Sequence, residues 1–127
     1  MTPLAITGIY AAALTGFYLV LSARVIVMRR GNRISLGDGD STEMQRRIRA
    51  HGNFAEYVPL GLVLLAVAES QQEAVVWLHA VGGLLLAGRL MHGINFSFGM
   101  RSMVLRTGGM MLTFTSLLLG AVLAIPF

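Results

Sequence analysis

The chain has 127 residues, of which 55% are hydrophobic and 13% are charged, about half the charged share of an ordinary soluble domain. It contains no cysteine, which excludes disulfides, thiolate metal ligands and a cysteine nucleophile. The formal net charge is +4, but aromatic and basic residues are not interleaved as in nucleic-acid-binding folds, so we expect no nucleic-acid partner. The composition is typical of one small integral membrane domain.

Four apolar segments predict helices at about 3–28, 42–69, 73–96 and 103–126 of a single domain, residues 1–127. The first and last include long runs without charge, 4–23 and 107–127. About 20 residues, at ~1.5 Å each, span the ~30 Å hydrocarbon layer of a bilayer. Thr42 and Gln45 have the spacing of a capping box, which would start the second helix at Thr42. We therefore predict an all-α, integral membrane four-helix bundle.

The distribution of arginine predicts the orientation. All ten basic residues are arginines; seven lie in or beside the first loop and three in or near the third, whereas the second loop, 69–73, has two acids and no base. The positive-inside rule places the first and third loops in the cytoplasm, with both termini outside. The simplest role of the basic loop residues is to set this orientation and contact anionic lipid headgroups. It applies to Arg29, Arg30, Arg33, Arg46 and Arg47.

Small residues recur at intervals of four, as Gly8, Ala12 and Gly16 in the first helix and as Gly83 and Ala87 in the third. Such stripes let helix backbones approach closely in lipid. The spacing is compatible with packing inside one chain and with contact between copies.

A polar group interrupts the start of the second apolar segment. Arg49, Asn53 and Glu56 lie at i, i+4 and i+7 and share one helix face, with Tyr57 beside them. A carboxylate near hydrocarbon is costly, so Glu56 should have a partner.

Further polar residues fall toward the same, cytoplasmic side of the other helices: Arg24, Arg89, His92, Arg101 and Arg106. Two interpretations follow. One is an internal ion-pair network in which the carboxylate of the second helix meets Arg89 or Arg24. The other is a cytoplasm-facing pocket for a small anionic ligand, with access from the lipid for an apolar one. Scattered histidines predict no metal site.

Residues 49–60, Arg-Ala-His-Gly-Asn-Phe-Ala-Glu-Tyr-Val-Pro-Leu, resemble the second-helix signature of the MAPEG family, the membrane-associated proteins in eicosanoid and glutathione metabolism. The resemblance covers nearly the whole chain, including Ser22-Ala23-Arg24 and the pair Arg89 and His92. It implies a homotrimer of four-helix bundles that binds glutathione at subunit interfaces near the cytoplasmic face. Many members conjugate glutathione to lipophilic electrophiles, or use it in peroxide reduction or isomerisation.

The resemblance also implies roles for single residues. Glu56 would accept from the ammonium of glutathione, and Arg49 and Arg24 would hold carboxylates. An arginine near the start of the fourth helix stabilises the thiolate in the family; Arg106 is the first candidate and Arg101 the second. The implied glutathione contacts are Arg24, Arg49, Asn53, Glu56, Tyr57, Arg89 and His92. Phe96 stands where eicosanoid members often have tyrosine.

The preferred function is a glutathione-dependent transferase or peroxidase acting on hydrophobic small molecules in the bilayer. One alternative is a small transporter in which Glu56 is a proton-coupled site for a lipophilic cation. Another is a non-catalytic membrane protein. Arginines around the carboxylate favour an anionic ligand over a cationic one.

Overall fold

The computed structural model describes residues 3–127, and all the regular structure in that range is helical. The helices are α1 (Ala5–Asn32), α2 (Thr42–Ser70), α3 (Val75–Ser97) and α4 (Met103–Ala124). The predicted all-α four-helix fold is therefore confirmed. Helix α1 continues four residues beyond position 28, through the arginines that follow its apolar run. Residues 1 and 2 of the predicted domain lie outside the described part.

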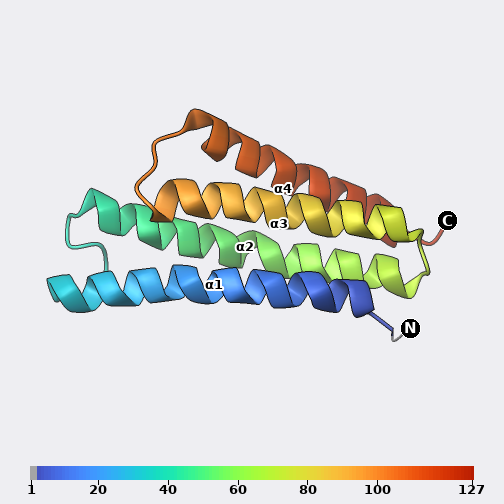
Figure 1. Cartoon of the computed structure of the whole chain (residues 1–127), viewed down its shortest axis with the longest axis horizontal. Helices are drawn as coiled ribbons and strands as arrows, with labels where there is room; N and C mark the ends of the chain where they lie inside the picture. Colours follow the sequence, from blue (N-terminus) through green and yellow to red (C-terminus); the bar gives the residue numbers. More distant parts are fainter. Residues whose placement is uncertain (1–2) are drawn as a thin grey trace.

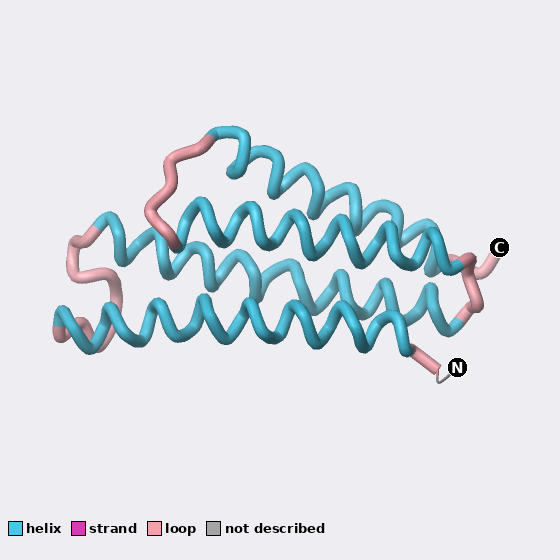
Figure 2. The backbone as a smooth tube through the Cα atoms, in the orientation of Figure 1, coloured by secondary structure: helices cyan, strands magenta, loops and turns pink. Residues whose placement is uncertain are grey.

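The four helices run up and down beside one another, with both termini at the end that also holds the α2–α3 turn (Figure 1). The loops α1–α2 and α3–α4 lie together at the opposite end (Figure 2). Helices α1 and α4 each contact both α2 and α3, but not each other within residues 3–127. Helices α2 and α3 therefore form the centre of the bundle, and the two loops with arginines in and beside them share one end.

The outer surface of the bundle is apolar. All four helices are long and apolar enough to cross a bilayer. Large hydrophobic side chains point outward from every helix, for example Ile9, Leu19, Val63, Val76 and Leu118. Water would disfavour so much continuous apolar surface, whereas acyl chains solvate it well. The chain is an integral, multi-pass membrane protein.

Glycines bring α3 and α4 almost into backbone contact. A Cβ on Gly88 would lie 2.7 Å from the carbonyl oxygen of Gly109, so only glycine fits at this crossing. By contrast, a Cβ on Gly8, Gly16 or Gly83 would meet nothing within 4 Å. The small-residue stripes seen in the sequence therefore do not pack inside the chain, and different glycines make the close helix contacts.

Two caps hold helix ends in place. The N-cap of α2 is Ser41, whose hydroxyl accepts the backbone N–H three residues on, so the predicted capping role of Thr42 is wrong. Helix α1 has no side-chain cap of its own; the carboxylate of Glu69, from α2, accepts the N–H groups of Ile6 (2.9 Å) and Thr7 (2.8 Å). Glu69 thus ties the first turn of α1 to the far end of α2.

Candidate ligand site

An ion pair lies on the outward face of α2. Arg49 Nη2 is 3.0 Å from Glu56 Oε1, and both side chains are more than half exposed in the single chain. The residues are seven apart, and their side chains meet over Gly52, where a Cβ would lie 3.3 Å from the arginine. The network predicted between Glu56 and Arg89 or Arg24 is wrong, because Glu56 pairs with Arg49 on its own helix, while Arg89 and Arg24 donate to neutral groups.

Arg89 of α3 is buried, with 1% of its surface exposed. Its Nε and Nη2 donate to the hydroxyl of Thr113 at 3.1 and 2.8 Å, and Nη1 donates to the side-chain oxygen of Asn53. Nη2 also lies 3.4 Å from the sulfur of Met110. All these acceptors are neutral, and the ion pairs within residues 3–127 do not include Arg89. A buried cation without a carboxylate attracts an anion strongly.

Tyr57 links this cation to α4. Its ring packs edge-on against Phe114, with centroids 5.7 Å apart. The Cζ of Arg89 lies 5.5 Å from the centroid of the tyrosine ring. Tyr57 therefore sits where α2, α3 and α4 meet.

An aromatic stack supports two more arginines nearer the helix ends. His92 stacks on Phe96 with centroids 4.5 Å apart, and its Nδ1 is buried without a hydrogen-bond partner among the described residues. The Cζ atoms of Arg46 and Arg106 lie 4.6 and 5.6 Å from the centroid of the Phe96 ring. Phe96 therefore holds one arginine of α2 and one of α4 beside the same ring.

Arg46 is a member of this group that the sequence interpretation assigned only to orientation and lipid contact. It donates to the carbonyl oxygens of Asn95 (2.9 Å) and Met100 (2.6 Å), which attaches α2 to the end of α3. Its position three residues before Arg49 places both on one face of α2 and was the signal that could have identified it.

These contacts define one surface, which we call the α2–α4 polar face. Arg46, Arg49, Arg89 and Arg106 all lie within electrostatic range of His92, and Arg101 lies within range of Arg46. The carboxylate of Glu56 lies beside them and pairs with Arg49. The face consists of Arg46, Arg49, Asn53, Glu56, Tyr57, Arg89, His92 and Arg106, with Arg101 at its edge.

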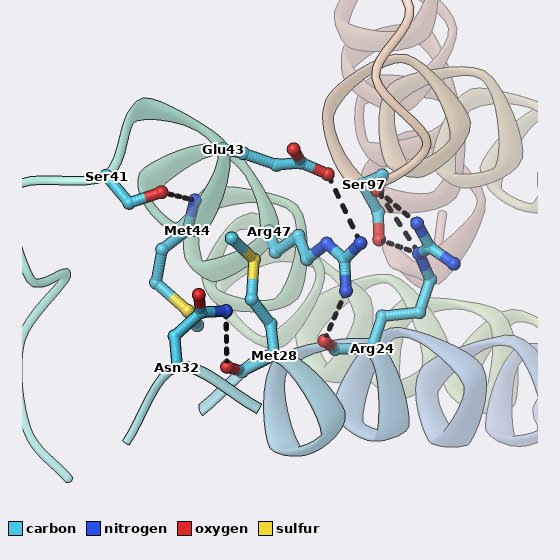
Figure 3. Close-up of polar contacts among 8 residues, drawn as sticks. All are labelled: Arg24, Met28, Asn32, Ser41, Glu43, Met44, Arg47 and Ser97. Carbon is cyan, nitrogen blue, oxygen red and sulfur yellow. Dashed lines mark hydrogen bonds and ion pairs between the residues drawn. The ribbon is translucent and has the colours of Figure 1, made fainter. Parts of the chain in front are cut away.

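Arg24 lies elsewhere. Its Nε and Nη2 donate to the carbonyl oxygen of Ser97 at 3.2 and 2.9 Å, and its Cζ lies 3.8 Å from the centroid of the Phe98 ring. Arg47 donates to the carbonyl oxygen of Arg24 and to Glu43, which closes a separate cluster between α1, α2 and the end of α3 (Figure 3). One chain does not bring Arg24 to the α2–α4 polar face.

Fold and site together define a four-span helical membrane protein with an arginine-rich polar face built into its spanning helices. The chain belongs to the MAPEG family, whose model matches residues 7–126, so the resemblance of residues 49–60 is confirmed. It is similar to the inner membrane protein YecN of Escherichia coli strain K12, with 36% identity over 114 residues, 90% of this chain and 86% of YecN. YecN of Escherichia coli O6:H1 strain CFT073 matches to the same extent. No solved structure is a significant match.

Proposed function

We propose that this protein binds glutathione at the α2–α4 polar face and conjugates it, through its sulfur, to lipophilic electrophiles that arrive from the bilayer. The observation that carries the proposal is that four arginines, Arg46, Arg49, Arg89 and Arg106, come within electrostatic range of His92 on helices otherwise suited to lipid, and that Arg49 pairs with the carboxylate of Glu56. Such a face is complementary to a small, net-anionic molecule.

The Arg49–Glu56 pair suits one end of glutathione. That end carries an ammonium and a carboxylate on one carbon, so it can enter the pair with each charge meeting its opposite. Glu56 then accepts from the ammonium, and Arg49 donates to the carboxylate through its planar fork. The pair is outward-facing and more than half exposed, so it can open for a ligand without disturbing the core.

The reaction needs the thiolate form of the ligand. A free thiol has a pKa of about 8.5, and lowering it by two units corresponds to about 2.7 kcal/mol. Arg106, near the start of α4, is the proposed catalytic cation, with Arg101 as the second candidate. The thiolate sulfur attacks the electrophilic carbon; the carbon–sulfur bond forms as the leaving group departs with its electron pair. The thiol proton passes to solvent.

We also propose that the site is completed by a second copy, within a homotrimer. A helix rises about 1.5 Å per residue, so it needs roughly 20 residues to cross the hydrocarbon layer. If α2 enters that layer at Glu69, it leaves it near Arg49. Glu56 then lies about 10 Å inside, where acyl chains would not solvate an exposed ion pair. The unpacked stripe of Gly8 and Gly16 offers α1 as a contact surface. A neighbouring α1 could bring its own Arg24 toward the ligand.

The orientation belongs to the same proposal. The loops α1–α2 and α3–α4, with most of the arginines in them or on the adjoining helix ends, share one end of the bundle (Figure 1). The positive-inside rule assigns this end to the cytoplasm, so glutathione would enter from there and the apolar substrate from the bilayer.

The contacts weigh against a carrier of lipophilic cations. A cationic cargo would have to displace Arg49, which lies 3.0 Å from Glu56 Oε1, and it brings no carboxylate to pair with the displaced arginine. The surrounding arginines would also repel the cargo.

Binding is tested by thermal unfolding of the purified protein in detergent with increasing glutathione. At a concentration of about 100 times Kd, a ligand of the folded state adds about 2.7 kcal/mol of stability. We expect a rise in Tm for the wild type that is lost in Arg49→Gln and Glu56→Gln. Arg47→Gln is the matched control for Arg49→Gln. It also removes one arginine from α2, but Arg47 pairs with Glu43 and not with Glu56. No shift at millimolar glutathione, or equal loss in the control, contradicts the proposal.

Turnover is tested with an activated aryl halide as the electrophile. Arg106→Gln should lower the rate of conjugate formation at saturating glutathione far more than it lowers glutathione binding, because the arginine acts on the thiolate. Binding of glutathione without conjugation of any of a panel of lipophilic electrophiles would leave a ligand site but refute the transferase.

A further inference from the structure

A groove lies at the C-terminal end of α1, where the α1–α2 loop begins. Its volume is about 440 Å³, and it shares no residue with the α2–α4 polar face. Three arginines form its rim and two isoleucines its apolar walls. The lining residues are Ile26, Arg29, Arg30, Arg33, Ile34 and Ser35.

The groove is shaped by a tight end to the helix. The N–H of Ile34 donates to the carbonyl oxygen of Arg29 at 2.9 Å, as in a Schellman turn. Arg33 occupies the left-handed position of this turn, with φ of 55°, where glycine is usual. Arg29 Nη1 donates to the carbonyl oxygen of Gly37 at 2.8 Å, and Ile34 packs where a Cβ on Gly39 would be. The first loop is thereby fastened against the groove.

The positive charge of the groove is not neutralised by the chain. The side chains of Arg30 and Arg33 make no hydrogen bond or ion pair within residues 3–127. The neighbouring acid Asp38 is engaged elsewhere: its two oxygens accept from the N–H of Asp40 and the amide of Gln45, both at 2.8 Å. The rim therefore offers free guanidinium groups to an anion.

The apolar wall continues toward the bilayer. Ile26 and Val27, about one turn before the arginines, are exposed, and they belong to the segment that spans the membrane. A basic rim above an exposed apolar wall, at the end of a spanning helix, lies at the boundary between headgroups and acyl chains.

We infer that this groove binds one anionic phospholipid, with the headgroup phosphate between Arg30 and Arg33 and an acyl chain along Ile26. Charge complementarity and the apolar wall both select a lipid, since a free phosphate would use only the rim. Diffuse attraction of basic loops to a membrane requires only net charge, whereas this groove holds two unpaired guanidinium groups beside an exposed apolar side chain, as binding of a single lipid molecule requires.

The test is native mass spectrometry of the protein in mild detergent with phosphatidylglycerol or phosphatidylcholine. The wild type should retain one phosphatidylglycerol per chain in preference to phosphatidylcholine. Each basic residue near the surface contributes about fivefold, so Arg30→Gln with Arg33→Gln should weaken retention about thirtyfold. Arg47→Gln removes a charge from the same end of the bundle, outside the groove, and should retain the lipid. Equal retention of both lipids, or equal loss in the control, overturns the inference.

A second variant separates lipid binding from folding. Arg33→Gly removes the cation and places the residue that the left-handed turn prefers, so the protein should be at least as stable as the wild type and yet retain phosphatidylglycerol about fivefold more weakly. Unchanged retention in this variant would refute the site. Inorganic phosphate should not displace the lipid at millimolar concentration; displacement would mean that only the anion is recognised.

Discussion

The hydroxyl of Thr113 supports the buried cation of the site, and its removal is the sharpest test of that arrangement. It accepts two hydrogen bonds from Arg89, at 3.1 and 2.8 Å, and both groups are buried. Thr113→Val replaces the hydroxyl with a methyl group of similar size and leaves two guanidinium donors without an acceptor. A hydrogen bond to a charged group is worth about 1.5–3 kcal/mol. Because the two bonds share one oxygen, we expect a loss of about 3 kcal/mol.

The assay is thermal unfolding in detergent. About 3 kcal/mol corresponds to a fall in Tm of about 12 °C for a chain of this size. Thr115→Val is the matched control, since its hydroxyl is exposed and bonds only to the carbonyl oxygen of Met111 in its own helix (2.8 Å). This control should lower Tm by less than about 2 °C. Similar shifts in the two variants would mean that Arg89 does not depend on Thr113 and that its environment is different from the one described.

Three further predictions concern other parts of the molecule. Glu69→Gln should raise the rate of hydrogen exchange in the first turns of α1, because a charged cap of the helix N-terminus is lost. The loss should lower the stability of this helix end by about 1 kcal/mol. Glu73→Gln, which removes an acid from the same turn, should leave this exchange unchanged, and equal effects would refute the cap. Phe96→Leu should weaken glutathione binding about tenfold through loss of its two arginine contacts, whereas Phe96→Tyr keeps the ring and the affinity. If Phe96→Tyr weakens binding equally, the ring is not the support. Because the chain has no cysteine of its own, the single-cysteine variants Ser35→Cys and Gln72→Cys report on which side of the membrane the first and second loops lie. In intact cells an impermeant thiol reagent should label only the cysteine at position 72; the reverse pattern would invert the proposed orientation.

The helices were predictable because lipid imposes a simple requirement on sequence. A spanning segment must be apolar and about 20 residues long, so hydropathy alone predicts four helices. The helix boundaries were harder to predict from the sequence. Arg29 and Arg30 are polar but continue α1, and the N-cap of α2 is Ser41, where Thr42 had been predicted. Local propensity and hydrogen bonding, and not hydropathy, decide these positions.

The shared face of Arg49, Asn53 and Glu56 followed from helical spacing, but their partners did not. Spacing along one helix does not reveal how the neighbouring helix is rotated, so the contact of Arg89 with Thr113 was not predicted. The close crossing of α3 and α4 was missed for a similar reason, because it pairs single glycines from two helices and has no repeat within either.

The most direct measurement is the ultraviolet absorbance of the thiolate of glutathione bound to the wild type and to Arg106→Gln as a function of pH. If the α2–α4 polar face stabilises the anion, glutathione bound to the wild type ionises about two pH units below the free thiol, and the variant binds it with a thiol pKa near the usual 8.5. Bound glutathione that ionises like the free molecule in the wild type, or an unbound ligand at millimolar concentration, would contradict an anion-receptive face.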